Sequence, residues 1–186
     1  LHGVQVGTAD GASDDVDSLN DGMVNSELAM AVDPAEAFVN PGEFTETVMI
    51  HNASDLAGSE FNLAFDPAVV QVSEMALGAF PESTGRTATT QVDFDNVPGT
   101  LSFEAFTVGT ADGPSGSGAL AVISFEALDA GDTALDLFDL AVYDTEPTEE
   151  TPADMDGVVH VVDAGIQVVP ADQEVFEEET FTVDVM

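Results

Sequence analysis

Short stretches in which apolar and polar residues alternate recur along most of this chain, and they constrain its fold more than any other feature. The clearest of them are residues 44–50 (FTETVMI), 61–65 (FNLAF), 101–105 (LSFEA) and 121–125 (AVISF). In the first stretch, the alternation places Phe44, Val48 and Ile50 on one face. A period of two residues is typical of a β-strand with one buried face. No stretch combines helical periodicity with capping residues, so the sequence predicts an all-β fold.

Residues that form turns separate these stretches at short, regular intervals. Such turns are indicated at residues 40–42 (NPG), 66–67 (DP), 98–99 (PG), 112–114 (DGP) and 130–131 (AG). Regular spacing of short strands and turns is typical of a β-sandwich, which we expect over residues 28–163. Residues 1–27 are rich in Asp, Gly and Ser and predict an acidic linker. Residues 146–152 (EPTEETP) predict an exposed loop inside the domain, because the strand-like residues 158–162 follow them.

The charge of the chain is strongly one-sided. It has 37 acidic residues against one Arg and no Lys, which gives a formal net charge of −36, yet 44% of its residues are hydrophobic and 12 are Phe. Disordered chains are poor in such apolar residues, so we expect a folded protein that works in concentrated salt. At about 1 M salt the screening length falls to roughly 3 Å, and surface carboxylates then repel each other little. The composition also argues against binding to nucleic acid or to anionic membranes, since both need Lys and Arg.

The sequence gives little support for an enzyme or for membrane insertion. No Cys is present, and no apolar run approaches the roughly 20 residues that a membrane-spanning helix needs. The histidines His2, His51 and His160 lack the spacing of a helical zinc motif. The nearest match to a nucleophile elbow, residues 113–117 (GPSGS), ends in Ser where that motif has Gly. We therefore predict a protein without catalytic activity and without a required cofactor.

The end of the chain resembles an earlier part of it. Residues 30–49 (MAVDPAEAFVNPGEFTETVM) and 166–186 (IQVVPADQEVFEEETFTVDVM) share Pro, Val and Phe-Thr in the same order. We interpret residues 164–186 as a partial second repeat; the alternative is that any two strands of one sandwich look alike. The apolar residues of this segment would need a partner strand, either in their own domain or in a neighbouring chain. We expect a neighbour, and the strand-exchange residues would be Phe176, Phe181, Val183 and Val185.

Five motifs in order resemble the cohesin family over about residues 28–163. They are residues 40–43 (NPGE) before the strand FTETVMIHN, 56–72 (LAGSEFNLAFDPAVVQV), 99–103 (GTLSF), 116–125 (GSGALAVISF) and 157–161 (GVVHV). The resemblance implies a jelly-roll β-sandwich of about nine strands. It also implies that one sheet face binds another protein, usually a calcium-loaded dockerin.

The resemblance points to the strand LAGSEF and its neighbour as the recognition region. Gly58 stands where many cohesins have Asn, Glu60 stands near a position that is commonly acidic, and Glu104 lies on a strand that the family also uses. The alternation independently directs Glu60 and Asn62 away from the core. The protein-binding candidates are therefore Gly58, Glu60, Asn62 and Glu104; the alternative is that these acids are only part of a solvated acidic surface.

Two further motifs suggest a metal site and a modification site. Residues 15–28 (DVDSLNDGMVNSEL) resemble a calcium loop, with Asp17, Asp21 and Asn25 at ligand positions, but Leu19 and Leu28 stand where two more ligands belong. Because two ligands are missing, we interpret this segment as an acidic linker, and a looser calcium site is the alternative. Asn52-Ala53-Ser54 forms an N-glycosylation sequon at Asn52.

Three functions remain compatible with the sequence. The first is an extracellular or cell-surface interaction module that binds a dockerin-like protein or copies of itself. The second is a structural subunit that forms a filament or surface layer, as exchanged strands could build a homopolymer. The third is a carbohydrate-binding module, which is disfavoured because sugar platforms use exposed aromatic rings and the chain has no Trp and one Tyr.

Overall fold

The computed structural model describes residues 27–146 and 148–162, and these residues form β-strands connected by turns and loops. The strands of the first half are β1 (Ala29–Asp33), β2 (Glu36–Val39), β3 (Gly42–Ala53), β4 (Leu56–Ala64), β5 (Val70–Leu77) and β6 (Thr87–Asp95). Those of the second half are β7 (Thr100–Val108), β8 (Gly116–Ala127), β9 (Gly131–Asp144), β10 (Glu149–Glu150), β11 (Ala153–Met155) and β12 (Gly157–Val161). The prediction of an all-β fold is confirmed.

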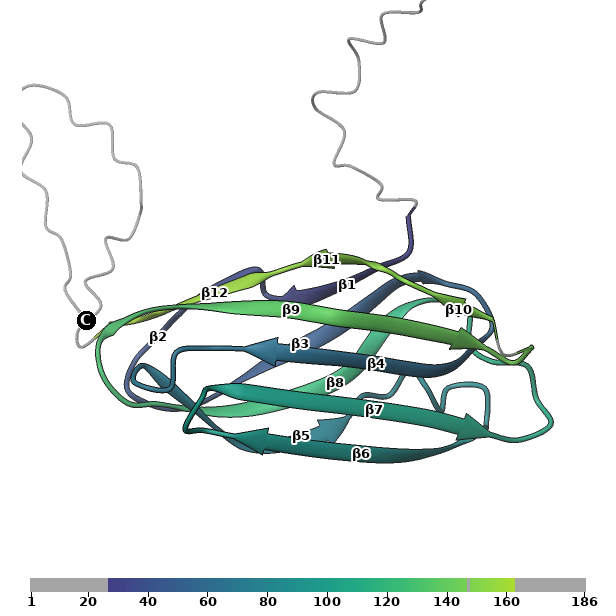
Figure 1. The fold of residues 1–186 in the computed structure, drawn as a ribbon, viewed down its shortest axis with the longest axis horizontal. Helices are drawn as coiled ribbons and strands as arrows, with labels where there is room; N and C mark the ends of the chain where they lie inside the picture. The colour runs from purple at the N-terminus through teal and green to yellow at the C-terminus, as the bar shows by residue number, and fades with distance from the viewer. Residues whose placement is uncertain (1–26, 147, 163–186) are drawn as a thin grey trace, which may run out of the picture.

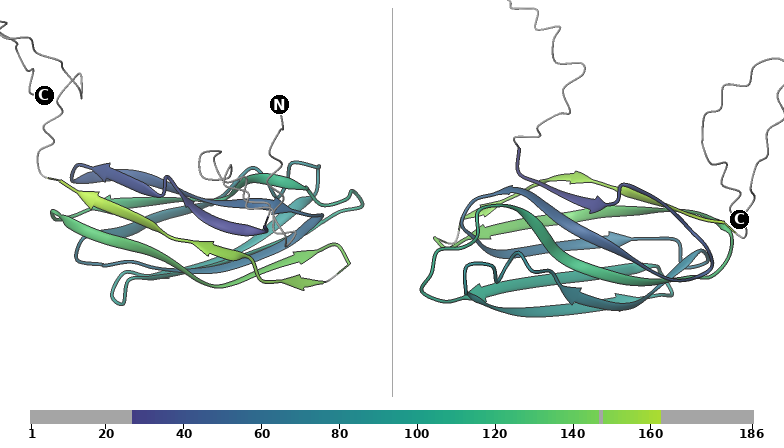
Figure 2. Two further views of the ribbon diagram at one scale, coloured as in Figure 1. Left: turned by 90° about the horizontal axis from the view of Figure 1, so that it is seen from above. Right: turned by 180° about the vertical axis from the view of Figure 1, so that it is seen from behind.

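The strands build two sheets that face each other. One sheet has five strands in the order β11-β1-β3-β8-β5, and the other has seven, in the order β2-β12-β9-β4-β7-β6 with β10 added beside β9. In Figure 1, strands β9, β4, β7 and β6 of the seven-stranded sheet run horizontally and follow one another from top to bottom, with β3, β8 and β5 of the other sheet behind them. Figure 2 shows the same two layers from above and from behind.

Two long strands change sheets, and this accounts for the difference between twelve segments and the expected nine strands. The first is interrupted at Asp33-Pro34, where the peptide bond is cis, so that β1 belongs to one sheet and β2 to the other. The last is interrupted at Asp156, so that β11 belongs to the five-stranded sheet and β12 to the seven-stranded one. When each is counted as one strand and the two-residue β10 is set aside, nine strands remain. The predicted jelly-roll sandwich is therefore confirmed.

The core lies between the sheets and contains the residues that the alternation directs inward. Phe61 of β4 and Phe103 of β7 are 1% and 0% exposed, and their stacked rings lie 5.0 Å apart between centroids. Phe125 of β8, on the five-stranded sheet, is fully buried, and its ring lies edge-on to that of Phe65 at 5.7 Å between centroids. Burial of a side chain of this size stabilises a fold by about 2–3 kcal/mol, so these rings fix the inner face of β4 and β7 and thereby direct their alternate residues outward.

The predicted strands are found in β3, β4, β7, β8 and β12. The described residues 146 and 148–151 are exposed, as expected of a loop, but Glu149–Glu150 form the short strand β10 and Pro152 is buried. Across the described residues, no helix is long and apolar enough to cross a membrane. The predicted linker (residues 1–27) lies almost entirely outside the described residues, and the predicted partial repeat (residues 164–186) lies wholly outside them. The proposed domain boundaries therefore stay predictions.

Candidate protein-binding face

The outer face of β4 and β7 carries three of the four predicted recognition side chains. Glu60 of β4 lies directly opposite Glu104 of β7, and Asn62 lies opposite Ser102 in the next outward row. All four side chains are partly exposed, whereas Phe61 and Leu63, which alternate with them, are buried. The structure thus brings Glu60, Asn62 and Glu104 together on one solvent-facing surface.

Gly58, the fourth predicted residue, lies beneath an aromatic pair. It is opposite Phe106 of β7 on one side and Tyr143 of β9 on the other, and the two rings lie 5.7 Å apart between centroids. A Cβ atom at position 58 would lie 2.6 Å from Cδ1 of Phe106 and 3.2 Å from Cδ2 of Tyr143. The absence of a side chain therefore lets the Phe106 ring rest on the backbone of β4, and a larger residue would displace it.

Carboxylates that have no cationic partner within residues 27–146 and 148–162 surround the other end of this surface. Glu60, Glu104 and Asp139 line a shallow hollow together with Asn62 and Ser102, and the Asn62 side-chain amide donates a hydrogen bond to Asp139 Oδ2 at 3.3 Å. The pKa of Tyr143 is raised, first by desolvation and then by the negative charge of Glu60 and of Glu149. We call Phe106, Tyr143, Glu60, Glu104 and Asp139 the acidic–aromatic strip.

The single Arg of the chain does not neutralise this strip, because its guanidinium donates hydrogen bonds to the Thr107 hydroxyl and to backbone carbonyls. Arg86 Nε donates to Thr107 Oγ1 at 2.8 Å and Nη2 donates to the Thr107 carbonyl at 2.9 Å. Its Nη1 donates to the carbonyl oxygens of Ala111 at 2.6 Å and Gly109 at 3.3 Å. Arg86 therefore anchors the end of β7 and the loop that follows it.

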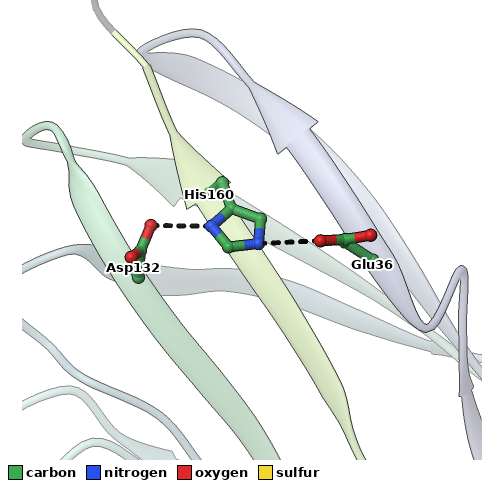
Figure 3. A network of polar contacts seen from close by, with 3 residues as sticks. All are labelled: Glu36, Asp132 and His160. Carbon is green, nitrogen blue, oxygen red and sulfur yellow. Dashed lines mark hydrogen bonds and ion pairs between the residues drawn. The ribbon is translucent and has the colours of Figure 1, made fainter.

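A second acidic cluster on the seven-stranded sheet does contain a partner that can carry positive charge, a histidine. Figure 3 shows His160 of β12 between Asp132 of β9 and Glu36 of β2. Its Nδ1 lies 2.7 Å from Asp132 Oδ1 and its Nε2 lies 3.2 Å from Glu36 Oε1. The hydrogen bond with Asp132, followed by the charges of both carboxylates, raises the pKa of His160. Phe38 stacks on the imidazole at 4.6 Å between centroids, so this cluster joins three strands.

Comparison with known proteins assigns the family. The profile of the cohesin domain matches residues 28–161. The chain belongs to the cohesin family. Among the curated proteins, none matches this cohesin significantly.

Solved cohesin structures share the fold of this chain. A non-cellulosomal cohesin from the archaeon Archaeoglobus fulgidus aligns at 19% identity over 73% of this chain and 91% of its own, with a TM-score of 0.57. The OlpA cohesin of Clostridium thermocellum, solved with the dockerin Doc918, aligns at 16% identity over 73% and 99%, with a TM-score of 0.61. The third ScaC cohesin of Acetivibrio cellulolyticus was solved with a ScaB dockerin mutated in its C-terminal helix. It aligns at 17% identity over 73% of this chain and 99% of its own, with a TM-score of 0.59.

A hydrogen-bonded aspartate holds the start of β4 in place in this cohesin. Asp55 accepts a hydrogen bond from the Gly113 backbone N–H at 2.6 Å through Oδ1, and a short one from the Thr145 hydroxyl through Oδ2. These bonds, that of Thr145 first, lower the pKa of Asp55. The β3–β4 turn is thereby tied to the β7–β8 loop and to the end of β9, on either side of the acidic–aromatic strip.

A buried glutamate lies far from this face, inside the sandwich. Glu46 of β3 is 2% exposed, and its Oε2 has no hydrogen-bond partner among the residues that the structure describes. Burial, followed by the negative charge of Asp33, raises its pKa to about 7. The same alternation that directs Phe44, Val48 and Ile50 inward places Glu46 on the inner face, so the pattern contained this information.

Three members of the acidic–aromatic strip, which are Phe106, Tyr143 and Asp139, were not identified from the sequence. Extending the alternation of residues 101–105 by one position would have placed Phe106 outward beside Glu104, whereas Tyr143 and Asp139 join the strip only because β9 pairs with β4. Asn52 is exposed at the end of β3, and its side-chain amide donates to the Glu27 carbonyl at 2.9 Å.

The remaining predicted site residues lie outside the described part of the chain. They are the calcium candidates Asp17, Asp21 and Asn25 and the strand-exchange candidates Phe176, Phe181, Val183 and Val185. Within residues 27–146 and 148–162, no group of three or more His, Asp or Glu side chains is arranged to hold a metal ion.

Proposed function

We propose that this cohesin domain is a non-catalytic module that binds a dockerin-like protein through the outer face of β4, β7 and β9. The observation that carries the proposal is the acidic–aromatic strip, a solvent-facing surface with rings and with carboxylates that no basic side chain of the described residues neutralises. An exposed aromatic ring is the kind of residue that dominates binding energy at protein interfaces. Membership of the cohesin family and the dockerin complexes of its structural neighbours support the same conclusion.

The composition supports the setting in which we expect the module to act. A chain with a net charge of −36 repels itself at low ionic strength, and concentrated salt removes most of that cost. We therefore propose that it works on the outside of a cell that lives in high salt, where it joins proteins into assemblies.

The proposal is tested by titrating the full chain with dockerin modules encoded in the same genome, in 2 M KCl with calcium, by isothermal titration calorimetry. Ser102 on the strip side and Ser124 on the five-stranded sheet are both partly exposed strand residues and form a matched pair. We expect Ser102→Trp to weaken binding at least tenfold and Ser124→Trp to leave it unchanged. Equal effects of the two substitutions, or the absence of binding to every module, would contradict the proposal.

Self-assembly is the second candidate function, and the internal repeat favours it. Residues 30–49, which residues 166–186 resemble, form β1, β2 and the first part of β3 in the structure. A second copy of this segment could complete another domain. Light scattering of the full chain in 2 M KCl tests this candidate, with Phe181→Asp as the disrupting variant: assemblies that persist in the variant would contradict it.

A further inference from the structure

The four strands that end the two sheets differ in how well they are protected against pairing with a further strand. They are β11 and β5 in the five-stranded sheet and β2 and β6 in the seven-stranded sheet. An edge strand presents unpaired backbone groups, and folded proteins protect such edges by short length, bulges, prolines or inward-pointing charges. β11 and β2 have only three and four residues. The two longer edges, β5 and β6, therefore decide where a strand can be added.

β5 is protected at its centre. Its pairing with β8 shifts register between Val72 and Glu74, as a β-bulge does. The side chain of Asn96 also covers this point, because its Oδ1 accepts a hydrogen bond from the Val72 N–H and its Nδ2 donates one to the Val72 carbonyl, both at 2.9 Å. Asn96 thus occupies the place that an added strand would need.

β6 lacks these protections over most of its length. It has nine residues without Pro (TATTQVDFD), pairs with β7 without a register shift, and lies at the lower margin of the molecule in Figure 1. The Ala88 N–H donates a hydrogen bond to Glu82 Oε1 at 2.8 Å and therefore points away from β7. Alternate residues of an antiparallel strand direct their backbone groups to the same side. The backbone groups of Thr90, Val92 and Phe94 consequently also point away from β7.

The inner side of β6 is apolar and only partly covered. Val92 lies opposite Phe103 and Phe94 lies opposite Leu101, so both side chains point to the core side of the sheet. Phe103 and Leu101 are buried, whereas Val92 and Phe94 are 37% and 38% exposed. The acidic residues of the strand alternate with these positions and point to the other side. β6 therefore combines an open backbone edge with an exposed apolar side that carries no protecting charge.

We propose that β6 pairs antiparallel with β6 of a second copy of this chain, in the register that places Val92 opposite Val92 of that copy. Thr90 then lies opposite Phe94 of the second copy, so all three open positions form hydrogen-bonded pairs. A register shifted by one residue toward the N-terminus would have to include Ala88, whose N–H is already bonded to Glu82.

The charges of β6 favour the same register. With Val92 opposite itself, Asp93 lies opposite Gln91 of the second copy. Asp95 likewise lies opposite Thr89. Like charges directly opposite each other destabilise a sheet, and a register centred on Asp93 would place that carboxylate opposite itself. The strand is therefore self-complementary in one register, as a twofold symmetric contact requires.

The pairing would join the seven-stranded sheets of two copies into one continuous sheet. Because the twofold axis is perpendicular to this sheet, both copies present their β4, β7 and β9 faces on the same side of it. Each copy has a net charge of −36, so the two repel each other at low ionic strength, and concentrated salt screens this repulsion. The inference uses neither the acidic–aromatic strip nor residues 164–186, and it stands or fails independently of both.

Sedimentation equilibrium of the full chain in 2 M KCl, from micromolar to millimolar concentration, tests the proposal. The matched variants are Val92→Asp, which adds a charge on the inner side of β6, and Val108→Asp, which adds the same charge at a 66% exposed Val of β7. Circular dichroism and thermal unfolding establish that each variant is folded. We expect the parent and Val108→Asp to form the same dimer, and Val92→Asp to raise its dissociation constant at least tenfold.

Oxidative cross-linking tests the register. The chain has no Cys, so a single introduced Cys reports only on contact between copies. Opposite residues of a hydrogen-bonded pair have Cα atoms about 5.5 Å apart, which a disulfide can span. In 2 M KCl, Val92→Cys should therefore be converted to a covalent dimer under mild oxidation, and Val108→Cys should stay monomeric.

Three results would overturn the inference. The first is a parent protein that stays monomeric at millimolar concentration. The second is a dimer on which Val92→Asp and Val108→Asp have equal effects, or equal cross-linking of the two Cys variants. The third is an assembly that Phe181→Asp abolishes and Val92→Asp does not change, which would assign self-assembly to residues 164–186 instead.

Discussion

Two groups of carboxylates on the outer face of the same sheet differ in one respect, the presence of a side chain that can carry positive charge. At the β2–β12–β9 end, Asp132 and Glu36 hold His160 between them. On β4, β7 and β9, Glu60, Glu104 and Asp139 meet no basic side chain in the described residues; Glu60 and Glu104 lie opposite each other, and Asp139 accepts a hydrogen bond from the uncharged Asn62. The carboxylates of the first group bind His160 and thereby join three strands, whereas those of the second group remain available to a partner.

The comparison teaches that the number of acids on a surface says little about function in a chain of this composition. With 37 acidic residues, neighbouring carboxylates are inevitable, and what distinguishes them is how each is compensated. Asp55 is fully hydrogen-bonded and has a lowered pKa, while Glu46 is buried without a partner for Oε2 and has a raised one.

Glu46→Gln extends the comparison to the interior and should have the largest effect. The pKa of Glu46 is about 7 in the folded protein and 4.5 for the ordinary group. The free energy of unfolding therefore falls as the pH rises from about 4.5 through 7, and above that range it falls no further. Each pKa unit corresponds to about 1.4 kcal/mol, and we expect the variant to be more stable by about 3 kcal/mol at pH 8 and by almost nothing at pH 4. Urea unfolding of the variant and the parent at both pH values measures the difference in their free energies of unfolding. An equal difference at pH 4 and pH 8 would refute the raised pKa of Glu46.

Arg86→Gln tests whether the one basic residue belongs to the fold or to the strip. Loss of hydrogen bonds from a charged donor to partly buried carbonyls should lower the free energy of unfolding by about 2 kcal/mol, while affinity for a partner at the strip stays unchanged. Arg86→Lys, which keeps the charge but not the forked geometry, should recover only part of the loss. A change in affinity without a change in stability would place Arg86 in the binding face instead.

Glu104→Gln examines the uncompensated group directly. Removing one of two opposed charges should stabilise the free protein by up to about 1 kcal/mol at low salt, and the gain should shrink as KCl is added. Asp129→Asn, an exposed loop substitution outside any strand, is the control for net charge. A gain in Asp129→Asn as large as that in Glu104→Gln would show that net charge, not the cross-strand pair, is responsible.

His160→Gln examines the compensated group and should have the smallest effect. Because the folded pKa of His160 is raised above 6.5, its stabilising contribution is fully present below pH 6.5 and is lost as the pH rises through the folded value. The variant should therefore have a lower melting temperature than the parent below pH 6.5 and approach that of the parent as the pH rises through the folded pKa of His160. A difference that grows with pH would mean that the histidine is held neutral.

Much of the fold could be predicted from the sequence because its signal is local. The alternation in residues 61–65 and 101–105 is a property of a few neighbouring residues, and it correctly separated Phe61 and Phe103 from Glu60 and Glu104. The change of sheet at Asp33-Pro34 could not be predicted in this way, since it depends on β2 pairing with β12 at the other end of the chain. Glu46 was overlooked although the pattern placed it, because a carboxylate is not expected in a core.

The sequence by itself determined the all-β class, the family and the direction of the side chains along each strand, since these depend on residue periodicity and on ordered motifs. Only the tertiary structure decided which strands are neighbours. Strand pairing places Tyr143 and Asp139 beside residues about 80 positions earlier in the chain. It also brings Arg86 to the carbonyl of Thr107 and His160 between Asp132 and Glu36. Pairing between distant strands is set by packing of the whole sandwich, and the acidic–aromatic strip exists only because of that packing.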